Sequence, residues 1–108
     1  MDLTLEEFKK VELKTARILE ASEIPGTDRI WKLLVDLGTE KREIVAGIKV
    51  FYAKEALIGR TVVIVQNLAP AIIRGVESRG MLLAAKDPSG TLSLITTDRE
   101  TPPGSSVG

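Results

Sequence analysis

The chain has 108 residues with 15 basic and 15 acidic side chains, so its formal net charge at pH 7 is zero. This length suits one domain, and the neutral balance argues against a polycation that coats nucleic acid indiscriminately. Cysteine and histidine are absent, which excludes disulfides, thiol nucleophiles, zinc–thiolate sites and the usual general base near neutral pH. Because no run of about 18 apolar residues and no signal-peptide pattern occurs, we expect a cytoplasmic protein with no membrane span, metal or cofactor.

The charge is unevenly divided along the chain. Residues 1–28 hold 4 basic and 7 acidic side chains, residues 29–86 hold 10 and 5, and residues 87–108 hold 1 and 3. The middle therefore carries a net charge of +5 between ends of −3 and −2. A localised surplus is what a phosphate-binding face requires, although a surplus of this size is more often ordinary solvated surface.

The chain begins with a predicted helix and a predicted curved strand. A capping-box pattern at Thr4 predicts a short helix over residues 5–10. Apolar residues then alternate as in a strand, but the phase changes between Leu13 and Ala16. We therefore expect a β-bulge near residues 14–15, of the kind that bends a strand around a barrel.

Short apolar segments separated by turn residues make up the rest of the chain. Strands are predicted over residues 30–37, 42–48, 61–65, 81–85 and 92–96, and a second short helix over residues 53–57. The tail over residues 101–108 is expected to be mostly irregular. Five or six short strands, with a helix between the third and fourth, predict an all-β, five-stranded oligonucleotide-binding barrel, the OB-fold. We expect one domain over 1–108: an N-terminal helix (1–10), the barrel (11–86) and a C-terminal extension (87–108).

The residues do not predict an enzyme. Without histidine, a nucleophile such as Ser78 needs a carboxylate base, and its neighbour Glu77 would point to the opposite face of a strand. Acidic pairs such as Asp28 with Asp36 are better interpreted as solvated surface charge. No glycine-rich phosphate-binding loop is present. We therefore expect no catalytic residue.

The segment after the fourth predicted strand has the features of a binding loop. It places Arg74, Ser78 and Arg79 between two apolar strands. Arginine binds phosphate or stacks on a base, and a serine hydroxyl bonds to phosphate or ribose. Gly75 and Gly80 allow the backbone to approach a ligand closely. On the residues alone, a binding role and an ordinary structural loop are about equally well supported.

The same segment resembles the signature of the tRNA-binding domain family. That family includes the C-terminal domain of bacterial methionyl-tRNA synthetases, its beta-subunit forms, free-standing tRNA-binding proteins and chaperone-like members. The resemblance is clearest at Arg74–Ala85 and covers about residues 5–97. Further motifs follow in the family's order, at Val11–Ile18, Gly26–Leu33, Val35–Gly38, Ile44–Ile48 and Asn67–Pro70.

The resemblance implies an OB-fold whose terminal extensions pair two chains as a homodimer. It also implies that the protein recognises tRNA by shape, as proteins commonly recognise folded RNA. Residues that match the family's contacts are Lys32, Asn67, Arg74, Ser78 and Met81. Charge and placement add Arg17, Lys49 and Arg79 as candidate contacts.

The resemblance favours a non-catalytic tRNA-binding protein that tethers tRNA for aminoacylation by a synthetase partner. Many members carry a basic residue where this sequence has Ala71, Ile72 and Ile73. If they are exposed, these isoleucines favour an alternative, a chaperone-like module that binds protein. A second alternative is a structural dimerisation unit, and the apolar segment Leu92–Ile95 is consistent with an interface.

Overall fold

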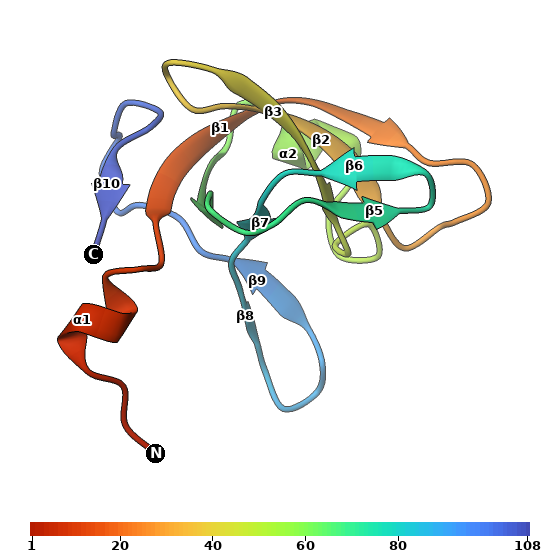
Figure 1. The fold of residues 1–108 in the computed structure, drawn as a ribbon. Helices are drawn as coiled ribbons and strands as arrows, with labels where there is room; N and C mark the ends of the chain where they lie inside the picture. The colour runs from red at the N-terminus through yellow and green to blue at the C-terminus, as the bar shows by residue number, and fades with distance from the viewer.

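One curved sheet forms the centre of the computed structural model, which describes residues 1–108 (Figure 1). Its strands follow the order β3-β2-β1-β4-β7, and neighbouring strands are antiparallel. Because β1 pairs with both β2 and β4, and β7 returns beside β3, the sheet curls into the predicted OB barrel. The strands are β1 (Leu13–Glu23), β2 (Trp31–Asp36), β3 (Lys41–Ala46), β4 (Thr61–Val65) and β7 (Met81–Leu82).

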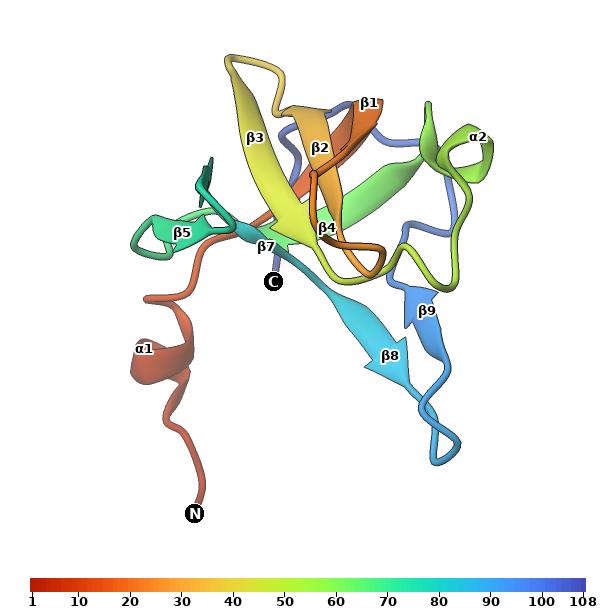
Figure 2. The same cartoon turned by 90° about the vertical axis from the view of Figure 1, so that its right-hand side faces the viewer.

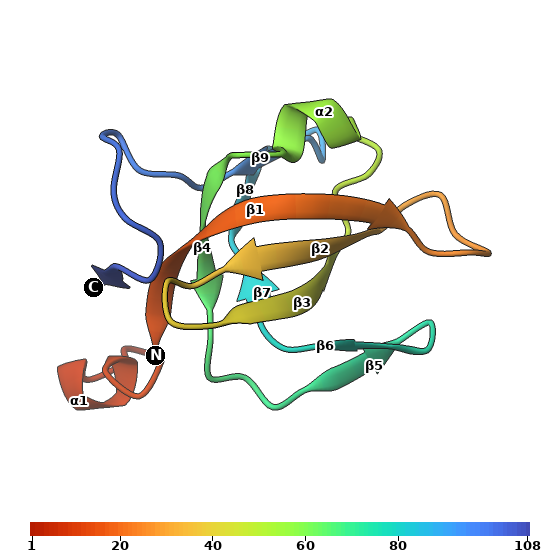
Figure 3. The same ribbon diagram turned by 90° about the horizontal axis from the view of Figure 1, so that it is seen from above.

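Alternating apolar residues of these strands fill the barrel. In β2 every second residue from Trp31 to Val35 is buried, as the predicted alternation requires. The short helix α2 (Lys54–Leu57) lies between β3 and β4, where the sequence predicted it, and its Leu57 is fully buried. Seen from above, β1, β2 and β3 run side by side with α2 nearby (Figure 3). The largest fully buried core side chains are Ile18, Leu33, Ile44, Ile48, Leu57 and Ile64.

The long strand β1 changes the face that it buries, but at a different place from the predicted one. Both Ile18 and Ala21 are buried, because the register with β2 shifts between Ile18 and Glu20. A bulge near residues 14–15 is therefore wrong. Thr15 is buried because the C-terminal segment covers the outer face of β1 there.

The C-terminal segment is more ordered than the sequence predicted. Its last residues form strand β10 (Ser106–Val107), which pairs with the start of β1. The Thr15 hydroxyl donates to the carbonyl oxygen of Pro102 at 2.9 Å and accepts from the amide of Ser105 at 2.9 Å. Most of residues 101–108 are irregular, as predicted, but the sequence did not predict β10, because an isolated tail sequence does not show the strand edge with which it pairs.

Two hairpins complete the strands, and each corrects a prediction. The expected loop around Arg74 contains strands β5 (Ala71–Ile73) and β6 (Val76–Ser78). The strand predicted over residues 81–85 divides into β7 and β8 (Ala84–Lys86), which pairs with β9 (Leu92–Leu94). In Figure 2 the β8–β9 hairpin projects away from the barrel, while the β5–β6 hairpin lies beside it.

The N-terminal helix α1 (Leu5–Phe8) is shorter than predicted, although its capping box is confirmed. The Thr4 hydroxyl accepts from the amide of Glu7 at 3.1 Å, and the Glu7 carboxylate accepts from the amide of Thr4 at 3.1 Å. The helix has no buried residue and stands apart from the barrel (Figure 1). No helix in the structure is long and apolar enough to span a bilayer.

The C-terminal segment reaches the turn after β2 through two glycines. A Cβ atom on Gly38 would come within 2.7 Å of the carbonyl oxygen of Pro103. A Cβ atom on Gly104 would overlap the carbonyl oxygen of Leu37, and Gly104 also has a φ of +84°. Only glycine therefore allows this close approach of the two backbones.

We predict that Gly104→Ala destabilises the protein more than Gly59→Ala does. Gly59 has a similar φ of +85° but open space around its Cβ position, so it is a matched control. The left-handed backbone alone should cost about 1–2 kcal/mol in either variant. The clash with Leu37 should add about 1–3 kcal/mol for Gly104→Ala. Urea unfolding measures both, and equal midpoints would contradict the docking of the tail.

Candidate nucleic-acid interface

The seam between β3 and the β6–β7 segment is held by side chains in place of a continuous ladder. The Ser78 hydroxyl accepts from the amide of Val45 at 2.9 Å and donates to the carbonyl oxygen of Gly80 at 3.2 Å. Next to it, the amide of Arg79 donates to the carbonyl oxygen of Glu43 at 3.0 Å. The hydroxyl thus satisfies a backbone amide that a neighbouring strand would otherwise bind.

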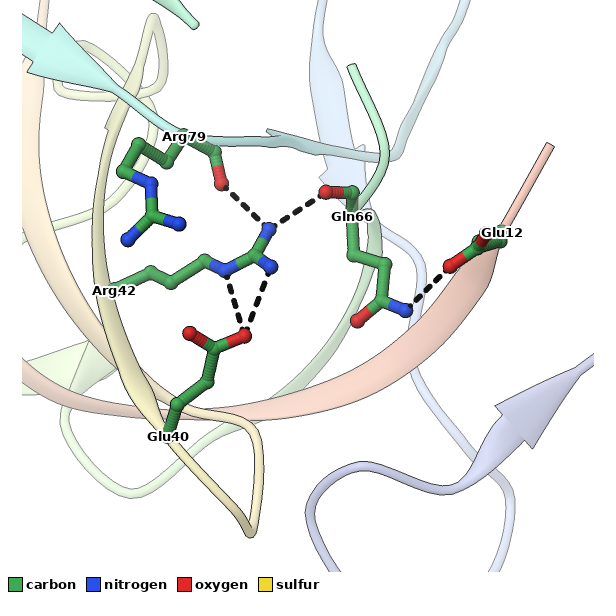
Figure 4. A network of polar contacts seen from close by, with 5 residues as sticks. All are labelled: Glu12, Glu40, Arg42, Gln66 and Arg79. Atoms are coloured by element: carbon green, nitrogen blue, oxygen red, sulfur yellow. Dashed lines mark hydrogen bonds and ion pairs between the residues drawn. The ribbon is translucent and has the colours of Figure 1, made fainter. Parts of the chain in front are cut away.

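One end of the seam is tied by the guanidinium group of Arg42 (Figure 4). Its Nε and Nη2 atoms donate to the Glu40 carboxylate at 3.1 and 2.8 Å. Its Nη1 atom donates to the carbonyl oxygens of Gln66 at 2.6 Å and Arg79 at 3.3 Å. The Gln66 side chain in turn donates to Glu12 at 2.8 Å. Arg42 therefore joins β3, the end of β4 and the segment between β6 and β7.

The charge of this cluster affects Glu40. The hydrogen bond from Arg42 lowers the pKa of the Glu40 carboxyl group below its ordinary value, and the charges of Arg42 and Arg79 act in the same direction. Partial desolvation opposes them. Folding therefore favours the ionised form of Glu40. Because Arg42 is bonded to this carboxylate and to two carbonyl oxygens, it acts as a structural clasp and is not free to bind phosphate.

Three of the predicted contacts lie around Val45, a residue that none of the sequence motifs singles out. Lys32 is the cross-strand partner of Val45, and Ser78 bonds to its amide. Met81 lines two surface hollows together with Val45. A signal existed in the sequence: Ile44 and Ala46 face the core, so the apolar Val45 between them must face outward.

The two hollows share Val45 and Met81 as a common wall. We call the first the hairpin hollow, about 190 Å³ in volume, because it lies between the β5–β6 hairpin and β3. We call the second the barrel hollow, about 170 Å³. The hairpin hollow is lined by Val45, Leu68, Ala69, Ala71, Ile73, Ser78, Gly80 and Met81. The barrel hollow is lined by Val45, Ala46, Gly47, Ile48, Met81, Leu82, Ala84 and Leu92.

Arg74 occupies the tip of the β5–β6 hairpin. Because Ile73 pairs with Val76, Arg74 and Gly75 form a two-residue turn, with φ angles of +51° and +81°. Arg74 is the one non-glycine residue with a positive φ. Its side chain is exposed and makes no hydrogen bond or ion pair within the chain. This cation is therefore available to a ligand.

Two of the predicted contacts, Asn67 and Ser78, have side-chain polar groups that are hydrogen-bonded within the chain. The Asn67 side chain accepts from the amide of Glu12 at 2.9 Å and donates to the carbonyl oxygen of Lys10 at 2.6 Å. Ser78 is buried, with its hydroxyl bonded as described. Both residues position the seam and its flanking loop. Their direct contact with tRNA stays a prediction.

The remaining predicted contacts lie away from Val45. The Lys49 ammonium group pairs with Glu23 at 3.0 Å and lies 4.8 Å from the centre of the Trp31 ring. Trp31 itself is in the core, and its indole N–H donates to the carbonyl oxygen of Tyr52 at 2.9 Å. Arg17 lies beneath the C-terminal segment, and its guanidinium group is 3.8 Å from the carboxylate of Glu100.

The arrangement offers no nucleophile with its base. Ser78 is buried, whereas its neighbour Glu77 is exposed on the other face of β6, and neither contacts the other's side chain. No group of three acidic side chains lies close enough to hold a metal ion. What the seam does offer is an apolar surface with cations beside it.

Comparison with known proteins places the chain among tRNA-binding domains. A family model described as "Putative tRNA binding domain" matches residues 13–106. The methionine–tRNA ligase of Thermotoga maritima is 50% identical over 105 residues, which are 97% of this chain and 16% of that enzyme. The chain thus spans about a sixth of the length of the curated relatives that it matches.

Two solved structures match the whole chain. The methionyl-tRNA-synthetase-related protein of Pyrococcus horikoshii has a TM-score of 0.94 at 38% identity, with 100% of both chains covered. The chaperone CsaA of Bacillus anthracis has a TM-score of 0.90 at 26% identity, again with 100% of both chains covered. The fold is therefore common to proteins with both descriptions.

We predict that the Arg42 clasp weakens in acid through Glu40. The pKa of the Glu40 carboxyl group is lower in the folded state than its ordinary value of 4.5. Such a group stabilises the fold fully at a pH above that ordinary value. This stabilisation is lost as the pH falls through the pKa of the folded state. Unfolding midpoints measured between about pH 6 and about pH 3 should therefore fall more steeply for the wild type than for Glu40→Gln.

The matched control is Glu55→Gln, because Glu55 is an exposed glutamate without an ion pair. This variant should follow the wild-type curve. Parallel curves for Glu40→Gln and the wild type would show that the Glu40–Arg42 contact does not stabilise the fold.

Proposed function

Because this chain belongs to the tRNA-binding domain family, we propose that it binds tRNA by shape, without catalysis, and tethers it to a methionyl-tRNA synthetase, within that enzyme or in trans. A second binding site raises the effective concentration of tRNA near the catalytic site without any new chemistry. The ligase relatives support this role, since the matched domain is only 16% of the length of the first of them.

The observation that carries the proposal is the backbone of Arg74. A two-residue hairpin turn with positive φ angles prefers asparagine or glycine at its first position. Arginine there has a φ of +51° and gains no contact within the chain. A strained backbone conformation that is not offset by contacts within the chain is typical of a residue with a functional side chain. The turn exposes this guanidinium group to solvent, where it can form bidentate hydrogen bonds with a phosphate group.

Lys32 is a second cation suited to phosphate. It pairs with Glu43 at 3.5 Å, but the two side chains are 35% and 52% exposed. An exposed pair of this kind contributes little to stability, so a phosphate group can replace the carboxylate at low cost. Lys32 and Arg74 thus supply positive charge from β2 and from the β5–β6 hairpin.

The hollows favour one alternative function, a chaperone-like module that binds protein. Their linings are mostly apolar, and the chaperone CsaA has the same fold. On the other face of β5, Ile72 is 69% exposed. Apolar surface of this kind accepts side chains of an unfolded segment. Competition between tRNA and an unfolded apolar peptide separates the two functions.

We also propose that two chains pair through their terminal segments. Exposed apolar side chains gather at the N-terminus, at Leu3, Leu5, Phe8 and Val11. Exposing such a cluster to water costs free energy, and burying it at an interface lowers the free energy. Sedimentation equilibrium tests the pairing, and a monomer at all concentrations would exclude it.

We predict that Arg74→Ala weakens tRNA binding by about tenfold at low salt and reduces the salt dependence by about one phosphate contact. Arg99→Ala is the matched control, since Arg99 is an exposed arginine of the C-terminal segment without an ion pair. It should leave affinity and salt slope unchanged. Fluorescence anisotropy over a salt series measures both. If no RNA binds at low salt, the proposed function is wrong.

A further inference from the structure

We propose that the hairpin hollow and the barrel hollow hold two unpaired nucleobases of the RNA, one on each side of the ridge formed by Val45 and Met81. This inference rests on the proposed function and adds a requirement to it. The RNA must present unpaired, unstacked nucleotides to the protein. Recognition by shape then also depends on whether the RNA has bases that can unstack.

The size of the hollows indicates what they hold. Volumes of about 190 and 170 Å³ fall below the range of about 300–1,000 Å³ that is usual for drug-sized ligands. Each hollow therefore suits one flat ring system. Two such hollows with a common wall suit neighbouring groups on one chain, as successive nucleotides are.

The ridge between the hollows is apolar and accessible. The Met81 side chain is 48% exposed, which is unusual for a residue that leads a strand of the barrel, and the half-buried Val45 stands beside it. A thioether is polarisable and packs well against aromatic rings. A base in either hollow would therefore contact Met81 with one face. Bases inside a duplex cannot do this, because their neighbours in the stack cover their faces.

The charges around the ridge favour RNA over an apolar peptide. Lys32 lies directly across from Val45 in the β2–β3 register, and Arg74 lies at the turn of the β5–β6 hairpin, whose strands line the hairpin hollow. The nearest acidic side chain on β3, Glu43, already pairs with Lys32. Cations beside small apolar hollows match a nucleotide, whose base is flat and whose phosphate is anionic.

A polar group inside the hairpin hollow also suits a base. The Ser78 hydroxyl accepts one hydrogen bond, from Val45, and donates one, to Gly80. A hydroxyl oxygen has two acceptor positions, so one remains for an N–H group of a base. The barrel hollow has no equivalent polar side chain. We therefore infer that it holds its base by packing alone.

The experiment compares RNA hairpins that differ only in their unpaired bases. The probes are a hairpin with a two-nucleotide bulge, the same hairpin with both bulged nucleotides made abasic, and a fully paired hairpin of the same length. Anisotropy at low salt should show the bulged RNA binding about tenfold more tightly than the abasic one. The abasic and paired hairpins should bind alike.

Two variants fill the hollows without disturbing the seam. Gly47→Leu fills the barrel hollow, since a Cβ atom on Gly47 meets nothing within 4 Å and its φ is not positive. Ala71→Leu fills the hairpin hollow from the exposed strand β5. Each should reduce the preference for the bulged RNA while binding to the paired hairpin is unchanged. Ala56→Leu, on the exposed face of α2, should behave as the wild type.

The outcomes separate this inference from the proposed function. If tRNA binds but the bulged and abasic hairpins bind equally, the nucleobase inference is wrong and the proposed function stands. If no RNA binds, both are wrong. If an apolar peptide shifts the NMR signal of the Met81 methyl group and the bulged RNA does not, the hollows serve protein binding and the nucleobase inference is overturned.

Discussion

The closure of the barrel between β3 and β7 is the constraint on which the rest of the structure depends. A backbone ladder runs through the other strand pairs, but at this seam the backbone hydrogen bond from Arg79 to Glu43 is joined by contacts of the Ser78 hydroxyl and the Arg42 guanidinium group. Buried backbone groups must find partners, and a fully satisfied polar network also specifies one arrangement of its members. The seam is therefore closed in a single geometry although it lacks a ladder.

The same constraint creates the surface that we assign to binding. Because the β5–β6 hairpin enters before β7, it lies beside β3 and leaves space between the two. A continuous ladder from β3 to β7 would bring the strands to within about 5 Å and fill that space. The hollows, the outward Val45 and the exposed Met81 thus follow from how the barrel closes, as does the place of the Arg74 turn at the hairpin tip.

Only a few of the cations near this surface are available to a ligand. The chain is neutral as a whole, and several cations of its basic middle are held by carboxylates, among them Arg42 by Glu40 and Lys49 by Glu23. Exposed Arg74 and the weakly paired Lys32 are left on the binding side. A face with few available cations makes few phosphate contacts, so its binding of an anion has a shallow salt dependence and little indiscriminate affinity. Neutral net charge and RNA binding are therefore compatible in this protein.

The sequence by itself determined the strands β1 to β4, the position of α2 and the barrel, because alternation of apolar residues and turn chemistry are local signals. Its motifs also pointed to Lys32, Ser78 and Met81, which the fold brings together at Val45. It placed the bulge of β1 wrongly and missed β10, since burial of Thr15 depends on a segment about 90 residues away. Which cations are free, which hydroxyl closes the seam and where the hollows lie were decided only by the tertiary structure, because each depends on partners distant in the chain.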